Sequence, residues 1–240
     1  PGNSIVFTIT GTGKRVAEAY EGSTLAPKLV YTAQDSDIAA LDATVRGKLI
    51  EVVNDIQYKN GTPIVDSLYE AALYYRGEAV DYGKSRGVSK VTDGVDLRVY
   101  SRVSHPDSYT GGNLNQATGC SADNLSATAC IDENITGNPV YTTPITESCQ
   151  ANYIVLLTDG SPSVNTSASK VEQLMGYTGS DSCADSGSKE CGHELVEYLK
   201  DNDQLSGMSD DQIIKTYTIG FNFSSDWIRD MAVKGGGSFY

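Results

Sequence analysis

The feature that most constrains the fold of this chain is a continuous apolar run, Tyr153–Leu157, which ends at Asp159-Gly160. A short apolar run without alternation is typical of a strand that is buried on both faces of a parallel sheet. A helical pattern follows over 190–199, then a strictly alternating strand pattern over 216–223, then a short helix capped by Ser225. This order predicts right-handed crossovers and an open α/β sheet. Ligands bind such sheets at the C-terminal strand ends.

Two helices are predicted upstream of this strand, over residues 35–76. The first has an apolar stripe at spacings of three or four, formed by Ile38, Leu41, Val45, Leu49, Val53 and Ile56. Asn60-Gly61 separates the two helices. Thr62 as N-cap and Pro63 at the first helical position are expected to open the second, which Arg76-Gly77 closes.

The remaining stretches are less regular. Residues 1–34 read as short strands, too few for a sheet that stands alone. We therefore expect them to be the end of a β-rich domain or an inserted β segment. Residues 35–240 would form the α/β domain, with a long polar insertion at 77–151. One candidate strand, near Leu97–Val103, is the only element predicted in that insertion.

The five cysteines point to local disulfide loops. Cys120 and Cys130 are close in sequence, as are Cys183 and Cys191, and both pairs lie in turn-rich segments. Such pairs favour disulfides and an oxidising compartment. Cys149 is left to pair outside the chain; in the alternative, Cys130 pairs with Cys149 and Cys120 is the odd one. No Cys-x-x-Cys pair is present, which disfavours zinc and thioredoxin-like sites.

Charge and hydropathy exclude several classes of function. Lys and Arg total 18 against 31 Asp and Glu, so the formal net charge is −13. This balance argues against nucleic-acid binding and against a basic helix adsorbed on a membrane. No apolar run is long enough for a transmembrane helix. The chain begins at Pro1, inside a stretch that reads as β structure, and we expect it to be part of a longer polypeptide.

The segment Asp159-Gly-Ser161-Pro-Ser163 is the most informative candidate site. A carboxylate and two hydroxyls beyond a buried strand are oxygen ligands for a hard cation such as Mg²⁺. The hydroxyl of Thr62 would join them if both segments meet at one sheet edge. In the alternative, the segment is a turn in which Asp159 and Ser161 bond local backbone N–H groups.

Three segments taken together resemble a von Willebrand factor type A domain: Gly61-Thr62-Pro63 opening a helix, then residues 153–160, then residues 216–221. More closely, the chain is similar to the PilY family of type IV pilus assembly and tip adhesin proteins, over most of residues 38–240. The stretches that carry this resemblance are GTPIVDSLYEAALYYRG, SCQANYIVLLTDGSPSVN, KTYTIGFNF and AVKGGGSFY. Residues 13–22 also resemble the end of a β domain inserted in some members. The resemblance implies an open, mostly parallel sheet with flanking helices.

The resemblance also implies a metal-ion-dependent adhesion site. In such domains an Asp-x-Ser-x-Ser motif, a later Thr and the Asp of a Thr-Asp-Gly loop hold the ion. Thr62 matches the Thr, Asp159 matches the last Asp, and Ser161 adds a hydroxyl. The first motif would lie upstream of position 1, so the expected Mg²⁺ or Ca²⁺ site is incomplete in this stretch.

The function implied by the resemblance is binding rather than catalysis. The expected roles are adhesion, type IV pilus assembly and twitching motility at the bacterial cell surface, after export through the periplasm. The expected partners are minor pilins or pilus subunits and a host or surface ligand. The alternative is a metal-independent structural domain of a surface or filament protein. A hydrolytic enzyme has least support, because adjacent residues such as Cys191-Gly-His193 lack the geometry of a nucleophile and its base.

Overall fold

The computed structural model describes residues 61–86, 103–120, 130–179, 181–221 and 223–240, with the backbone of 4–8, 91–92 and 95–96 and the single residue Gly47. The predicted helix over Ile38–Ile56 lies outside these residues, apart from Gly47. Most of the predicted β segment 1–34 also lies outside them, as does the candidate strand near Leu97–Val103, apart from Val103.

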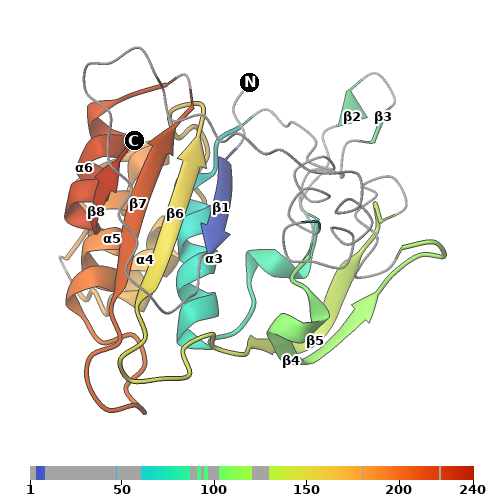
Figure 1. The fold of residues 1–240 in the computed structure, drawn as a ribbon. Coiled ribbons are helices and arrows are strands. Elements are labelled where there is room, and N and C mark those ends of the chain that lie inside the picture. Colours follow the sequence, from blue (N-terminus) through green and yellow to red (C-terminus); the bar gives the residue numbers. More distant parts are fainter. Residues whose placement is uncertain are drawn as a thin grey trace, which may run out of the picture.

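The centre of the fold is a four-stranded sheet with the order β1-β6-β7-β8 (Figure 1). Its strands are β1 (Ser4–Thr8), β6 (Asn152–Thr158), β7 (Ile214–Gly220) and β8 (Gly236–Phe239). The last three are parallel to one another, and β1 pairs antiparallel with β6, with Ser4 opposite Thr158. The predicted mixed α/β fold with a mostly parallel sheet is therefore present.

Four α-helices connect or flank these strands in the described part of the chain. They are α3 (Ile64–Arg76), α4 (Ala168–Leu174), α5 (Gly192–Asp201) and α6 (Asp226–Lys234). Short 3₁₀ turns occur at Tyr82–Lys84 (η1), Pro106–Ser108 (η2) and Gly187–Lys189 (η3). Within the described ranges, no helix is long and apolar enough to cross a membrane.

The ends of α3 show one correction to the sequence analysis. The helix cap is Pro63 rather than Thr62, and the first helical residue is Ile64. The backbone N–H of Thr62 instead donates to Ser163 Oγ at 2.8 Å, so the β6–α4 loop holds Thr62 outside the helix. The predicted end is confirmed, since Gly77 adopts the left-handed conformation (φ 65°) that terminates helices.

The later elements agree with the predictions in type but differ at their ends. The helix expected over 190–199 is α5, and the alternating strand is β7, which starts and ends earlier than expected. Ser225 caps α6 as predicted, because its Oγ accepts from Ile228 N.

Strand β8 was not anticipated, since its glycines read as a helix terminator. A Cβ on Gly237 would lie 2.2 Å from Thr216 O, so this close strand pairing requires glycine.

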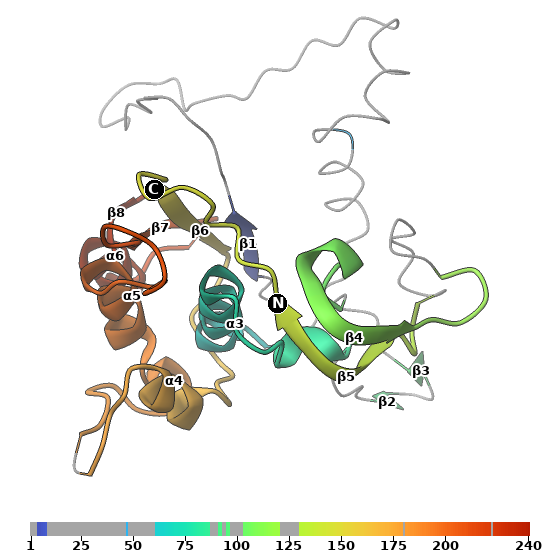
Figure 2. The ribbon, with the colours of Figure 1, turned by 90° about the horizontal axis from the view of Figure 1, so that it is seen from below.

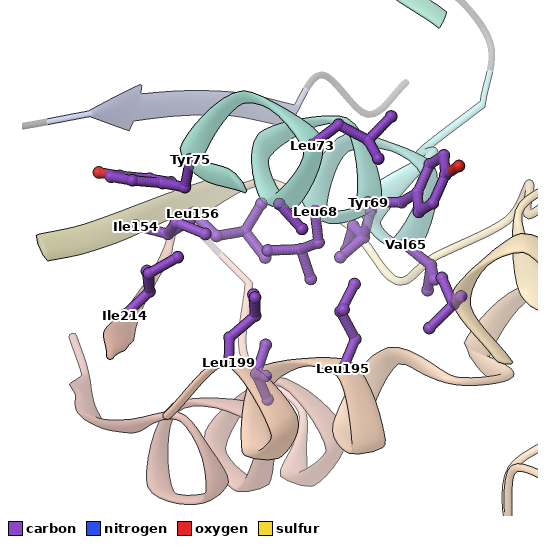
Figure 3. Packing of buried hydrophobic residues seen from close by; sticks show 14 of the residues in the cluster. Val65, Leu68, Tyr69, Leu73, Tyr75, Ile154, Leu156, Leu195, Leu199 and Ile214 are labelled. Atoms are coloured by element: carbon purple, nitrogen blue, oxygen red, sulfur yellow. The ribbon is translucent and has the colours of Figure 1, made fainter. Parts of the chain in front are cut away.

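The core lies between the sheet and the helices on one side of it. Figure 3 shows apolar side chains from α3, β6, α5 and β7 converging there. The fully buried residues of this core include Ile64, Val65, Leu68, Tyr75, Ile154, Leu156, Leu195, Leu199 and Ile214. The apolar stripe predicted for the second helix therefore packs inward. Burying these apolar side chains is the main stabilising term of the domain.

Strand β6 is not equally buried on its two faces. Ile154 and Leu156 are fully buried, whereas Val155 and Leu157 on the opposite face are only partly buried. Helices α3, α5 and α6 lie on one side of the sheet, which is the side of Ile154 and Leu156 (Figure 2). The sequence predicted full burial on both faces, and the apolar run alone could not show that one face packs more closely.

The insertion at 77–151 contains a hairpin that the sequence analysis did not predict. Strand β4 (Tyr109–Asn115) pairs antiparallel with β5 (Asn134–Tyr141). A two-residue pair, β2 (Val91–Thr92) and β3 (Val95–Asp96), lies in the same insertion. Figure 2 shows α3 between α5 and the β4–β5 hairpin. Backbone hydrogen bonds, including Tyr141 N to Glu78 O at 2.9 Å, join the hairpin to the chain after α3.

The loop between α5 and β7 is organised by Asp203. Its Oδ1 accepts from the backbone N–H of Gln212 and of Leu205, each at 3.0 Å. These bonds, from Gln212 first and then from Leu205, lower the pKa of the Asp203 carboxyl below its ordinary value.

We therefore expect Asp203 to make the stability of the domain depend on acid pH. The pKa of the Asp203 carboxyl is lower in the folded protein than in the unfolded chain. The ionised carboxylate therefore stabilises the fold at pH values above the ordinary carboxyl range, and this stabilisation is lost as the pH falls through the folded pKa. Asp203→Asn should reduce the loss of stability between about pH 5 and pH 3. Urea unfolding at both pH values would measure the free energy of unfolding of the variant and of the unmodified protein. An identical pH dependence in the variant and the unmodified protein would contradict the prediction.

Candidate functional site

The two segments that were expected to share a sheet edge lie in contact. Thr62 N donates to Ser163 Oγ at 2.8 Å, and Ser163 N donates to Thr62 O at 3.1 Å. A Cβ on Gly160 would lie 3.7 Å from Thr62 Oγ1. The Thr62 hydroxyl therefore lies beside the loop that carries Asp159 and Ser161, at the C-terminal end of β6.

A second contact holds the far end of this loop. Asp66, in the first turn of α3, is buried and accepts from Thr166 through both carboxylate oxygens. Thr166 N lies 2.8 Å from Oδ1, and Thr166 Oγ1 lies 3.0 Å from Oδ2. Hydrogen bonds to a charged acceptor are among the stronger ones in proteins. The loop is thus held at Ser163 by Thr62, which lies just before α3, and at Thr166 by Asp66 of α3 itself. These two contacts preorganise the residues between β6 and Ser163.

Sequence reasoning missed Asp66. An acidic residue in the first turn of a helix is expected on electrostatic grounds alone, since it complements the positive end of the helix dipole. Nothing in the local sequence indicates that it reaches a residue 100 positions later. Only the packing of α3 against the β6–α4 loop reveals that role.

The donor set at the edge consists of oxygen atoms. Thr62 is buried, Asp159 is half-buried, and Ser161 is exposed. A carboxylate and hydroxyls are the ligand chemistry of Mg²⁺ and Ca²⁺, which take six or more oxygens. Only one of these three groups carries charge. The residues present therefore fit part of a hard-cation site, and further oxygen ligands are needed to complete one.

The hydroxyl of Thr158, the last residue of β6, helps to close the turn that follows the strand. Thr158 Oγ1 donates to Gly160 O at 2.8 Å and lies 3.3 Å from Gly160 N, from which it accepts. The alternative interpretation, in which Asp159 and Ser161 bond local backbone N–H groups, stays a prediction. The hydroxyl of Thr158 is buried, as is common for a group that closes a tight turn.

Exposed apolar side chains border this polar loop. Phe221, directly after β7, donates its backbone N–H to Thr158 O at 2.8 Å. Its side chain is 70% exposed, and Val164 at the end of the loop is 41% exposed. The surface at this loop is therefore polar with two exposed apolar side chains.

The cysteines form both predicted disulfides, Cys120–Cys130 and Cys183–Cys191, and Cys149 is an exposed free thiol. Two groups of side chains in the described residues are close enough to hold a metal ion: Cys120, Cys130 and Glu133, and Glu172, Cys183 and Cys191. Their sulfurs are joined in disulfides, whereas metal ions bind thiolates. Thr62, Asp159 and Ser161 belong to neither group.

His193 is held by its neighbours rather than presented to a substrate. Its ring stacks on Trp227 at a centroid distance of 5.0 Å. Nε2 lies 2.9 Å from Trp227 O, and Nδ1 lies 3.4 Å from the Asp185 carboxylate. Both ring nitrogens are engaged, so the ring contributes to the packing of α5 against α6.

Comparisons with known proteins add no assignment to this geometry. No protein-family model, no curated protein and no solved structure matches the chain. The resemblance to the PilY family and to von Willebrand factor type A domains accordingly remains an expectation from the quoted sequence segments. The contacts of the loop after β6 with Thr62 and Asp66 come from the structure alone.

Proposed function

We propose that this domain is a cell-surface adhesion and type IV pilus assembly module that binds a protein or surface ligand at the C-terminal edge of its sheet. The single observation that carries the proposal is the contact between Thr62 and the loop 160–163. That contact brings together the two segments that the sequence assigned to one site, although 101 positions separate Thr62 from Ser163.

A divalent ion would link the domain to its ligand. Asp159, Thr62 and Ser161 would supply oxygen ligands to Mg²⁺ or Ca²⁺, and an upstream segment or the bound partner would supply the remaining ones. The fixed loop favours this role, since ligands held in place before binding lose less conformational freedom. The exposed ring of Phe221 beside the loop offers apolar contact area to the same partner.

The proposed setting is the bacterial cell surface, reached through the periplasm. Two disulfides are compatible with an extracellular protein. The proposed partners are minor pilins or other pilus subunits, together with a host or surface ligand. The formal net charge of −13 favours partners with basic surfaces over nucleic acids.

A second candidate is a metal-independent structural domain of a surface or filament protein. The observation that favours it is the mutual hydrogen bonding of Thr62 and Ser163, which gives both residues a role in holding the loop. In this case Thr62 and Ser163 fix the loop to the segment just before α3, and Asp159 needs no ion.

Replacing Asp159 separates the two candidates. In the full-length protein, Asp159→Ala should weaken Mg²⁺ or Ca²⁺ binding by at least about tenfold, because it removes the single charged ligand among the three. Isothermal titration calorimetry with each metal would measure the affinity, and Asp159→Asn would test charge at nearly constant shape. Asp211→Ala, at an exposed aspartate, is the matched control.

Thermal unfolding would check that both Asp159 variants retain the fold. If metal affinity is unchanged in both, the metal-dependent proposal is wrong and the structural alternative is favoured. If the affinity falls and attachment of the full-length protein to surfaces falls with it, the adhesion function is supported.

A further inference from the structure

A second loop contacts the β6–α4 loop (residues 159–167). This second loop runs from Cys183 to Cys191 and is closed by their disulfide, and we call it the disulfide loop. Within it, Ser188 Oγ donates to Pro162 O at 2.8 Å. Pro162 is buried and lies in the segment that carries the candidate oxygen ligands. The disulfide loop therefore contacts the candidate site directly.

Asn165 joins the same two loops more extensively. Its Nδ2 donates to Glu190 O at 2.8 Å and to Gly187 O at 3.3 Å, both in the disulfide loop. Its Oδ1 accepts from Ser167 N at 3.0 Å and from Ser167 Oγ at 3.1 Å. A carboxamide offers two N–H donors and one oxygen with two lone pairs. Every hydrogen-bonding position of the Asn165 side chain is therefore occupied.

The two ends of the Asn165 carboxamide have different tasks. The oxygen end bonds Ser167, two residues later, and so shapes the turn before α4. The nitrogen end reaches the disulfide loop, where the backbone carbonyls of Gly187 and Glu190 can only accept. An aspartate at position 165 would retain the local acceptor but would place a carboxylate against two carbonyl oxygens. Asn165→Asp therefore removes the bonds between the loops selectively.

The disulfide loop is itself fixed to the helices. Asp185 Oδ2 accepts from Trp227 Nε1 of α6 at 2.7 Å. Ala184 N donates to Glu194 Oε1 of α5 at 2.8 Å. These contacts and the disulfide hold the carbonyls that Asn165 binds, so the disulfide loop can act as a fixed support for the β6–α4 loop.

Asn165 lies between the two points at which the β6–α4 loop is held from the α3 side. Ser163 N donates to Thr62 O at 3.1 Å, and Thr166 N donates to Asp66 Oδ1 at 2.8 Å. Without the Asn165 bonds, the loop would keep these contacts but lose most of its polar attachment to the disulfide loop. The backbone N–H groups of Ser163 and Thr166 therefore report how firmly the loop is held.

We propose that Asn165 is a positioning residue of the candidate binding edge. Through Nδ2 it fixes the β6–α4 loop to the disulfide loop and so holds Asp159 and Ser161 in the arrangement that meets a ligand. Both ends of Asn165 are engaged, so it acts through the loop and does not touch the ligand itself. The role in ligand binding rests on the proposed function, whereas the joining of the two loops does not.

Hydrogen exchange, followed in ¹H–¹⁵N correlation spectra of the labelled chain, tests the joining of the loops. Asn165→Asp should lower the protection of Ser163 N and Thr166 N at least about tenfold. The matched control is Asn202→Asp, because Asn202 Nδ2 also donates to a backbone carbonyl, Tyr198 O at 3.0 Å, but at the end of α5. Unchanged protection in Asn165→Asp, or an equal loss in the control, would overturn the proposal.

A second set of variants separates this role from the local turn. In a Cys183→Ser/Cys191→Ser background the effect of Asn165→Asp should shrink below about twofold, because the two carbonyls are no longer held in place. An undiminished effect there would show that only the local turn matters. If the double variant does not fold, Ser167→Ala gives the same distinction, since it removes a local bond alone. A loss of protection in Ser167→Ala as large as that in Asn165→Asp would contradict the proposal.

The folding of Asn165→Asp is checked by thermal unfolding. If that variant does not fold, Ser188→Ala takes its place, because it removes the other side-chain bond between the loops, the one to Pro162 O. Ser188→Ala should likewise lower the protection of Ser163 N. Unchanged protection in this variant would count against the disulfide loop as a support.

Metal titration of the full-length protein tests the role in binding. Asp at position 165 would add a charge that attracts cations, so this test uses the neutral pair Asn165→Leu and Asn202→Leu. Asn165→Leu should weaken Mg²⁺ or Ca²⁺ binding at least about fivefold, and Asn202→Leu should leave it unchanged. Unchanged affinity despite lost protection would overturn the positioning role. If the unmodified protein binds neither metal, the adhesion-site proposal fails, and the exchange data still decide whether Asn165 joins the loops.

Discussion

Replacement of Glu70 by alanine is expected to lower the free energy of unfolding by about 3–5 kcal/mol, because four donors lose one acceptor. The Glu70 carboxylate accepts from the backbone N–H groups of Asp81, Tyr82 and Gly83, at 3.2, 2.9 and 2.9 Å. It also accepts from Tyr141 Oη at 2.7 Å. These bonds connect α3, the turn η1 and strand β5 of the hairpin through one side chain.

The Tyr141 hydroxyl shows how enclosed this cluster is. Burial raises its pKa, and the neighbouring charge of Glu70 raises it further. The hydroxyl also lies 2.7 Å from Ser104 Oγ. Removing the Glu70 carboxylate would therefore leave a largely buried phenol and three backbone donors with fewer partners, and the hairpin would lose its main polar attachment to α3.

Urea unfolding followed by circular dichroism would measure the effect. Glu70→Gln retains an acceptor oxygen at the same place, so its loss of stability should be less than half that of Glu70→Ala. Glu147→Gln and Glu147→Ala provide the exposed control pair. Equal effects of Gln and Ala at position 70 would show that the hydrogen bonds to its carboxylate are not the source of the stability.

Removal of the Cys183–Cys191 disulfide by serine at both positions is expected to cost about 2.5 kcal/mol. The two cysteines are separated by 8 residues in sequence, and closing a loop of that length restricts the unfolded chain by roughly this amount. Cys191 is fully buried and lies directly before α5 in the left-handed region (φ 66°), a conformation that a non-glycine residue rarely adopts. The disulfide therefore also fixes the start of that helix.

Trp227 provides the reporter for this change, since it is the only tryptophan in the chain. The Trp227 ring packs so closely against Gly192 that a Cβ atom at position 192 would lie 2.6 Å from Cζ2 of the ring. The indole Nε1 of Trp227 donates to Asp185 Oδ2 at 2.7 Å. Fluorescence-detected unfolding should thus show both the lower stability and an altered native spectrum. Cys149→Ser, at the exposed free thiol, should change stability by less than about 0.5 kcal/mol. A double variant as stable as Cys149→Ser would refute the prediction.

The pattern of apolar residues was sufficient to predict the elements whose burial is periodic. The stripe from Ile64 to Tyr75, the run Tyr153–Leu157 and the face of α5 with Leu195 and Leu199 each predicted an element that the structure contains. These elements depend on local periodicity and on one large apolar face, and both properties are visible in the sequence. The two disulfides were predictable for a related reason, since short loops keep their cysteines close together.

The β4–β5 hairpin and helix α4 gave no comparable signal. Strand β4 contains Gly111, Gly112 and three polar residues, and α4 has seven residues with only Val171 buried. Their stability comes from contacts with distant parts of the chain, such as Tyr141 with Glu70. Local propensity cannot indicate a hydrogen bond between residues 71 positions apart.

The candidate site divides in the same way. The residue types of Thr62, Asp159 and Ser161, and the placement of Asp159 beyond a buried strand, could be read from the sequence because they depend on local order alone. The contact of Thr62 with Ser163 and the anchoring of the loop by Asp66 were decided by the tertiary structure. Sequence determines which chemical groups are available and on which element each lies, whereas partners, burial and enclosure depend on how those elements pack.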